Sequence, residues 1–169
     1  MSTGSAETVD KQSLISEIER AFSGVLLDGG IGVNEANVID DYGDEDQRRQ
    51  ARLGDSKSWV GWQDIPDDTL RRHYTTFCFV DSKGFKYLIP AYMRFVLRNY
   101  EEDGSASIDS TIYALAPDNY NFDGFAELLT PEQKRAIKKF LEFLILDVGD
   151  DLVDASAAST AYESYWFQF

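Results

Sequence analysis

The chain has 169 residues, of which 43% are apolar and 14% aromatic, so it can build a core and a globally disordered chain is excluded. Its formal net charge of −14 argues against binding nucleic acid or anionic membranes, whose phosphates it repels, and favours a basic protein partner. No run of about 18 apolar residues occurs and no secretory signal opens the chain, so no membrane span is expected. The single cysteine, Cys78, allows no internal disulfide, and these features together predict a cytoplasmic protein.

The charge is unevenly distributed along the chain. Residues 1–60 carry a net charge of −6, residues 61–100 carry +2, and residues 101–169 carry −10. The C-terminal part is therefore the most acidic, and the middle is slightly basic.

Residues 1–10 are small and polar and predict a flexible arm, whereas 11–169 are predicted to form a single helical domain. Within 12–25, apolar residues recur every three or four positions, which is typical of one face of an amphipathic helix. From 28 to 55, glycines and an acidic run at 40–46 replace this periodicity. We therefore expect a long, acidic, glycine-rich loop there, with a short helix near its end. Loops this long are uncommon and are either functional or mobile.

A helix is predicted to begin near Pro66, because proline suits a first helical turn, where its missing N–H costs nothing. Residues 75–89 then fit two structures. Two apolar runs that flank Asp-Ser-Lys-Gly satisfy the signature of a short β-hairpin. The alternative is a helix end, a turn and a short helix that leads into Pro90, where a clear helix begins.

The strongest helix signal is at Thr130, which is followed by Pro131 in the first turn and by Gln133 where a capping box requires Glu or Gln. Further helices are expected over 107–115 and 155–169. The sequence thus predicts a mostly α fold, a single-domain bundle of about five to seven helices, with a short β-hairpin at 75–89 as the open alternative.

Four short motifs occur in order between about residues 59 and 166. They are Trp62-x-Asp64-Ile65-Pro66, Tyr87-Leu88-Ile89-Pro90-Ala91-Tyr92, Leu129-Thr130-Pro131-Glu132-Gln133 and the terminal pair Tyr165-Trp166. In this order they resemble a bacterial family known only as a domain of unknown function. The resemblance implies a bacterial source and an all-helical fold, which favours helix over hairpin at 75–89. It brings no activity and no catalytic residues. By analogy, small acidic bacterial domains are often immunity proteins that neutralise toxins.

Familiar catalytic and cofactor motifs are missing from the sequence, including the nucleophile elbow and the glycine-rich phosphate loops. The sole histidine, His73, is expected at a helix end rather than on a metal. The acidic run at 40–46 lacks the calcium-loop pattern and is expected to be solvated charge. Cys78 lies between two phenylalanines and is expected in the core. We expect no metal and no cofactor, and a binding role is favoured over an enzymatic one.

An acidic strip follows the best-predicted helix and contains no basic residue; its members are Asp147, Asp150, Asp151 and Asp154. Acids at a helix C-terminus oppose the helix dipole by a few tenths of a kcal/mol each, and such a local conflict sometimes marks function. We hypothesise that this strip, together with the run at 40–46, docks a basic partner. The alternative is a solvated turn.

Trp59 and Trp62 are a second candidate site. Two tryptophans this close could form an aromatic platform for a ligand or partner. The alternative is that they pack a helix entrance.

The predicted function is therefore that of a bacterial protein-binding module with an acidic surface, with immunity-type proteins as one form. One alternative is a small enzyme with carboxylate chemistry, which the missing motifs count against. Another is a structural protein or nucleic-acid mimic, which the slightly basic middle and the clustered charge count against.

Overall fold

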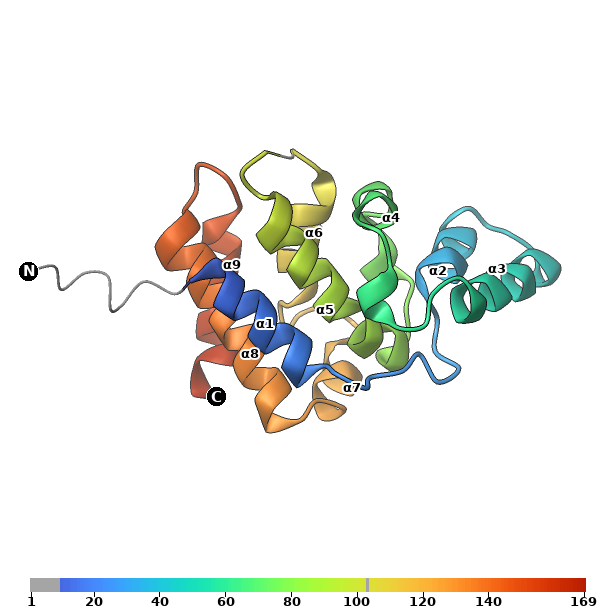
Figure 1. Cartoon of the computed structure of the whole chain (residues 1–169), viewed down its shortest axis with the longest axis horizontal. Coiled ribbons are helices and arrows are strands. Elements are labelled where there is room, and N and C mark those ends of the chain that lie inside the picture. Colours follow the sequence, from blue (N-terminus) through green and yellow to red (C-terminus); the bar gives the residue numbers. More distant parts are fainter. Residues whose placement is uncertain (1–9, 103) are drawn as a thin grey trace, which may run out of the picture.

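The longest helix, α5 (Ser82–Asn99), runs through the middle of the structure and carries much of its core (Figure 1). The computed structural model describes residues 10–102 and 104–169. Thirteen of the eighteen residues of α5 are buried. A helix that is buried on nearly all sides needs neighbours on all of them, and α1, α4, α6 and α7 each pack against α5.

The described residues contain nine α-helices and no strand, so the mostly α prediction is confirmed and the predicted number of five to seven helices is too low. Apart from α5, the helices are α1 (Lys11–Ala21), α2 (Val33–Asp40), α3 (Glu45–Lys57), α4 (Asp67–Arg72), α6 (Ala106–Ala114), α7 (Phe122–Glu127), α8 (Pro131–Phe143) and α9 (Ala155–Ser164). Short 3-10 turns lie at η2 (Trp62–Asp64), η3 (Thr76–Cys78) and η5 (Trp166–Gln168), and a π-helical segment, η4 (Leu144–Val148), continues α8. The predicted arm at 1–10 lies outside the described residues except for Asp10, whose carboxylate caps α1.

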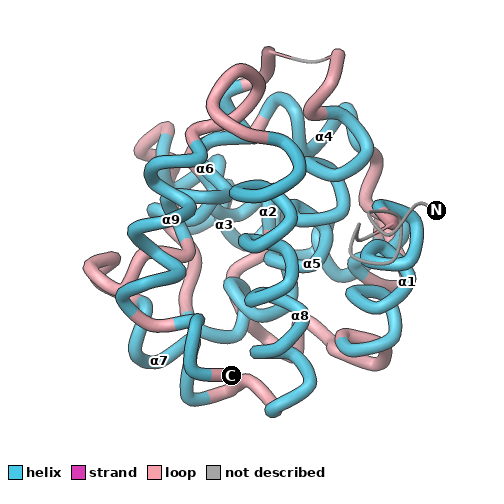
Figure 2. The backbone as a smooth tube through the Cα atoms, turned by 90° about the vertical axis from the view of Figure 1, so that its left-hand side faces the viewer, coloured by secondary structure: helices cyan, strands magenta, loops and turns pink. Residues whose placement is uncertain are grey.

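The helices are spread along one long axis. The pair α2 and α3 lies at one end, and α8 and α9 lie at the other (Figure 1). Viewed from the α8–α9 end, α6 lies beside α9 (Figure 2), and these two helices are in contact. Two regions that are both acidic in sequence are therefore separated by the length of the molecule.

The hairpin alternative for 75–89 is wrong. Asp81 caps α5 instead, since its carboxylate accepts the amide N–H of Gly84 at 2.9 Å and that of Ile31 at 3.0 Å. Phe85, Leu88 and Tyr92 then follow at helical spacing and are fully buried. The helix begins eight residues before Pro90, which lies inside α5. An interior proline costs about 3 kcal/mol, so the packing of this buried segment has to outweigh that cost.

The prediction of a long loop over 28–55 is wrong for most of this stretch, which forms α2 and α3, whereas the short helix expected near its end is present as α3. Asp55 on α3 caps α2 by accepting the amide N–H groups of Asn34 and Glu35, each at 2.9 Å. Glu35 is fully buried and binds two cations of α3, Arg52 at 2.7 Å and Arg48 at 3.2 Å. Polar contacts between residues about twenty positions apart thus hold α2 and α3 together. Sequence periodicity does not detect such contacts, because it responds only to an apolar stripe.

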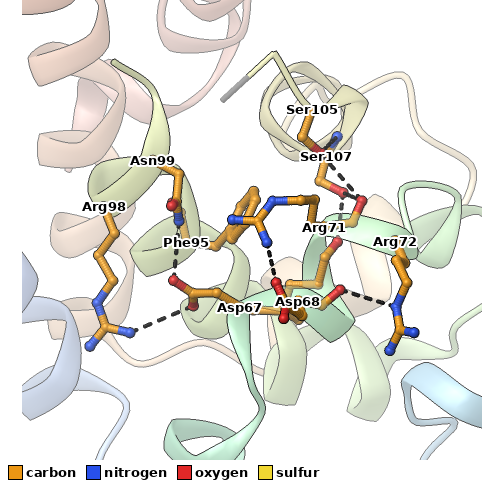
Figure 3. Close-up of polar contacts among 10 residues, drawn as sticks. Asp67, Asp68, Arg71, Arg72, Phe95, Arg98, Asn99, Ser105 and Ser107 are labelled. Carbon is orange, nitrogen blue, oxygen red and sulfur yellow. Dashed lines mark hydrogen bonds and ion pairs between the residues drawn. The ribbon is translucent and has the colours of Figure 1, made fainter. Parts of the chain in front are cut away.

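Helix α4 is fixed between α5 and α6 by polar contacts (Figure 3). Asp67 accepts from the Asn99 amide at 3.1 Å and pairs with Arg98 at 3.6 Å. At the other end of α4, the buried hydroxyl of Ser107 donates to the Leu70 carbonyl at 2.6 Å. Both ends of this six-residue helix are therefore attached to longer neighbours.

The capping box predicted at Thr130 is confirmed. The Thr130 hydroxyl accepts from the Gln133 amide at 3.2 Å, and the Gln133 side-chain oxygen accepts from the Thr130 amide at 3.0 Å. The Gln133 side-chain nitrogen also donates to the Ala21 carbonyl at 3.1 Å. The start of α8 is in this way attached to the end of α1.

Candidate protein-binding surface

The last thirty residues, 140–169, contain six acids and no lysine, arginine or histidine. They form the end of α8, the π-helical segment η4, a loop at 149–154 and α9. Helices α8 and α9 lie side by side at one end of the molecule (Figures 1 and 2). Helix packing therefore gathers the acidic tail of the sequence at this end.

The π-helical segment changes the direction of the side chains at the end of α8. The amide of Gly149 donates to the Leu144 carbonyl at 2.9 Å, five residues back, and Gly149 has a φ of +82°. Only glycine adopts that conformation without strain. Leu146 is 78% exposed, and it lies on the outward face of the helix, four residues after Glu142 and seven after Lys139. π-Helical turns of this kind frequently occur at functional sites.

A shallow groove of about 250 Å³ lies between the end of α8 and α9. Its floor is apolar, with Ile145 and Leu146 on one side and the ring of Tyr162 on the other. Glu142 and Glu163 supply carboxylates to its walls, and the Tyr162 hydroxyl donates to Glu142 at 2.9 Å. The groove can therefore accept an apolar side chain while its edges attract a cation.

The loop after the groove adds more charge and more apolar surface. Asp150 and Asp151 are exposed, and Leu152 beside them is 47% exposed. Together with the groove residues they form a surface that we call the acidic groove surface. It consists of Glu142, Ile145, Leu146, Asp150, Asp151, Leu152, Tyr162 and Glu163.

Eight of the 22 described acids outside 140–169 are paired with bases. On α4, for example, Asp67 pairs with Arg98 and Asp68 pairs with Arg71 (Figure 3). Seven further pairs join acids and bases that lie elsewhere: Glu101 with Lys11, Glu35 with Arg48 and Arg52, Asp46 with Arg49, Asp28 with Lys83, Glu19 with Arg94, and Glu17 with Lys139. By contrast, none of the six acids in 140–169 makes an ion pair with a described residue. Their charge is left for solvent or for a partner.

The four predicted strip residues do not all face the same way. Asp150 and Asp151 belong to the acidic groove surface. Asp147 is exposed and lies toward the end of α5, where the pKa of Tyr100 is raised by burial, by Glu101 and by the charge of Asp147. Asp154 caps α9 through the Ala157 amide at 3.0 Å and accepts from the Tyr113 hydroxyl at 2.9 Å. These two hydrogen bonds lower the pKa of Asp154, so it stays ionised.

The structure does not bring the two tryptophans to this surface. Trp62 is fully buried, and its indole N–H donates to the Phe22 carbonyl at 3.0 Å. Its ring is covered by the guanidinium of Arg94, 5.0 Å from the ring centroid. Trp59 is half-buried against the core and follows α3. The two residues pack a helix entrance, so the aromatic-platform hypothesis is not supported.

The acidic run at 40–46 is also remote from the strip. It ends α2 and begins α3, where Asp44 caps α3 by accepting the Gln47 amide at 2.8 Å. Since α2–α3 and α8–α9 occupy opposite ends of the long axis, the two acidic runs do not form one surface (Figure 1). The hypothesis that a basic partner docks on these acids stays a prediction, and the two runs would have to contact it at separate places.

The prediction that Cys78 lies in the core is wrong as well, because this thiol is exposed. The 3-10 turn η3 directs Phe77 inward and leaves Cys78 outside. His73 ends α4 as expected, and its pKa is lowered by burial and by neighbouring Arg72. Within 10–102 and 104–169, no group of three or more His, Cys, Asp or Glu side chains is placed to hold a metal ion. No helix of these residues is long and apolar enough to cross a membrane.

Sequence reasoning missed the groove itself, including Glu142, Leu146, Tyr162 and Glu163. The helical stripe of α8 predicts which residues face the core, and from it the outward position of Glu142 could have been inferred. The exposure of Leu146 could be inferred in the same way, because it lies four residues after Glu142 on the same helix face. The pairing of 142–146 with 159–163 depends on how α9 packs, which periodicity does not specify.

Residues 10–169 match a family described as "Family of unknown function (DUF6714)". No curated protein and no solved structure matches the chain.

Proposed function

The chain belongs to this family of unknown function. We propose that it is a protein-binding module whose acidic groove surface binds a basic, amphipathic segment of a partner protein. The observation that supports this most is the local lack of counter-charge. Four acids, Glu142, Asp150, Asp151 and Glu163, belong to the surface that carries the exposed apolar groove, and none of them makes an ion pair with a described base. Such charge both attracts and orients a basic partner.

The mixture of apolar and acidic groups favours an amphipathic segment over a purely cationic one. Leu146 and Leu152 are exposed beside the groove, where a leucine or isoleucine of a partner would bury them. Burial of about 100 Å² of apolar area contributes roughly 2.5 kcal/mol before the cost of association is subtracted. Acids alone would bind any cationic segment, with low selectivity and an affinity that depends strongly on salt. The groove additionally requires an apolar side chain of the partner that fits its shape.

An immunity-type role is the case of this proposal in which the basic partner is a toxin. A toxin gene directly beside the gene for this chain would support that case. A gene neighbourhood made of metabolic enzymes would count against it.

The test uses a synthetic helix-forming peptide with lysines on one face and leucines on the other, titrated by calorimetry. Asp150→Asn combined with Asp151→Asn should weaken binding at least about fivefold at low salt, and much less at high salt, where charge is screened. The matched control is Glu45→Gln combined with Asp46→Asn on α3, which removes the same charge at the other end of the molecule. Equal losses in both double variants would show that only net charge matters and would overturn the proposal.

A second pair of variants tests the apolar part. Leu146→Ala should weaken the peptide several-fold, whereas Leu26→Ala, an exposed leucine outside the groove, should not change its affinity. An unchanged affinity for Leu146→Ala would remove the groove from the proposal.

A further inference from the structure

Three exposed tyrosines gather around a hollow that is joined to Asp154, two residues after the last loop residue of the acidic groove surface. Tyr74 and Tyr113 line a hollow of about 150 Å³ and are 53% and 51% exposed. Tyr120 lies nearby, since its hydroxyl donates to the carbonyl of Cys78, which also lines the hollow, at 2.9 Å. Exposed tyrosines are common at binding surfaces, because their rings provide contact area at low entropic cost.

The hollow is joined to the acidic tail by hydrogen bonds. The Tyr113 hydroxyl donates to the carboxylate of Asp154 at 2.9 Å, and the amide of Asp154 donates to the carboxylate of Asp109 at 3.0 Å. Two carboxylates therefore stand at the edge of the aromatic hollow. They come from α6 and from the residue that caps α9, two helices in direct contact (Figure 2). The hollow is thus linked, through Asp154, to the loop that carries Asp150 and Asp151.

The bases nearest in sequence do not neutralise this edge. Arg72 donates to the carbonyl of Asp68 on α4 at 3.3 Å (Figure 3). His73 precedes Tyr74, and burial lowers its pKa. Neither Asp154 nor Asp109 makes an ion pair with a described base. The edge of the hollow therefore stays negative.

We infer that this hollow is an arginine subsite of the proposed partner surface, in which a guanidinium stacks on the exposed tyrosine rings and pairs with Asp154 or Asp109. This inference rests on the proposed function, because it assumes the same basic partner. A guanidinium is planar and weakly hydrated, stacks on aromatic faces, and forms bidentate pairs with carboxylates. An ammonium group is compact and strongly hydrated, and therefore gains less in a hollow with apolar walls. The subsite would thus select arginine over lysine.

The experiment compares two synthetic amphipathic peptides that differ only in having arginine or lysine at every cationic position. With the unmodified chain, the arginine peptide should bind about two- to fivefold more tightly than the lysine peptide, the range expected for an exposed cation–π contact. Tyr113→Leu should abolish this preference, and Tyr113→Phe should retain most of it. Tyr42→Leu, which alters an exposed tyrosine at the α2–α3 end, should leave the preference intact.

The outcomes separate the two proposals. If both peptides bind equally and salt-sensitively, the arginine subsite is overturned while the proposed function stands. If neither peptide binds, both are overturned. If arginine is preferred but Tyr113→Leu does not reduce the preference, the subsite is overturned at this place. Should Tyr113→Leu fail to fold, as judged by its thermal unfolding, Tyr74→Leu provides the same test from the other ring of the hollow.

Discussion

The carboxylate of Asp55 accepts the amide N–H of Glu35 at 2.9 Å and in this way closes the N-terminus of α2 from the end of α3. The Asn34 amide binds the same carboxylate. Asp55→Ala leaves two amides without this acceptor, and we expect it to lower the free energy of unfolding by about 2 kcal/mol. Urea unfolding measures this loss, and a change below about 0.5 kcal/mol would contradict the capping role.

The same residue predicts a dependence of stability on pH. Burial raises the pKa of Asp55 to about 6, from an ordinary value of 3.8. The folded state therefore takes up a proton on this carboxyl below about pH 6, whereas the unfolded state does so only near pH 4. Because the folded state binds the proton first, protonation stabilises it as pH falls from 7 to 4, and this gain is lost as pH rises through 6.

The measurement compares the unmodified chain with Asp55→Asn, whose side chain does not titrate. The difference between their free energies of unfolding should move in favour of the unmodified chain by at most about 3 kcal/mol between pH 7 and pH 4. A difference that stays constant across this range would show that the pKa of Asp55 is not raised.

Gly84 and Gly54 are both helical glycines, but their surroundings predict opposite effects of alanine. A Cβ at Gly84 would lie 2.0 Å from the Ile31 carbonyl oxygen, so Gly84→Ala should destabilise by about 2 kcal/mol or more despite the higher helix propensity of alanine. A Cβ at Gly54 would meet nothing closer than 3.9 Å, so Gly54→Ala should stabilise by about 0.5–1 kcal/mol. Thermal unfolding of the two variants tests both signs, and shifts in the same direction would refute the contrast.

The buried hydroxyl of Ser107 donates to the Leu70 carbonyl at 2.6 Å and helps attach α4 to α6 (Figure 3). Ser107→Ala should lower the free energy of unfolding by about 1–2 kcal/mol, because it removes a buried hydrogen bond. Ser156→Ala, at an exposed serine on α9, is the control and should change stability by less than about 0.5 kcal/mol.

The thiol of Cys78 is exposed, so it should react with a chromogenic disulfide reagent in the native protein. We expect stoichiometric labelling without denaturant, and none in Cys78→Ser. Labelling only after unfolding would show that Cys78 is buried in the core, as the sequence predicted.

Local signals in the sequence predicted local features well. The capping box at Thr130 needs only residues within four positions of one another, and it was found from the sequence. The same signature at Asp44 and Gln47 marks the start of α3, yet the absence of an apolar stripe there favoured a loop. Of the residues of α3 only Asp55 is buried, so its helical state depends on contacts that periodicity does not detect.

Features that depend on packing were not predictable. The apolar residues before Pro90 alternate as in a strand. The helical structure is explained only by the packing of α5, which is buried on nearly all sides. In the candidate surface, the acids of the loop were visible in the sequence. The groove beside them was not, because it arises where α9 packs against the widened turn at Leu146.

The polar construction of the α2–α3 pair implies that the molecule does not open all at once. Helix α3 offers the core no apolar side chain, whereas α2 buries Val33 and Ala36 there, so α3 can detach as a separate cooperative unit at a free energy below that of global unfolding. In native-state hydrogen exchange, its amides should lose protection first, and those of α5 last. Because α8 and α9 lie at the opposite end, such partial opening would leave the acidic groove surface assembled.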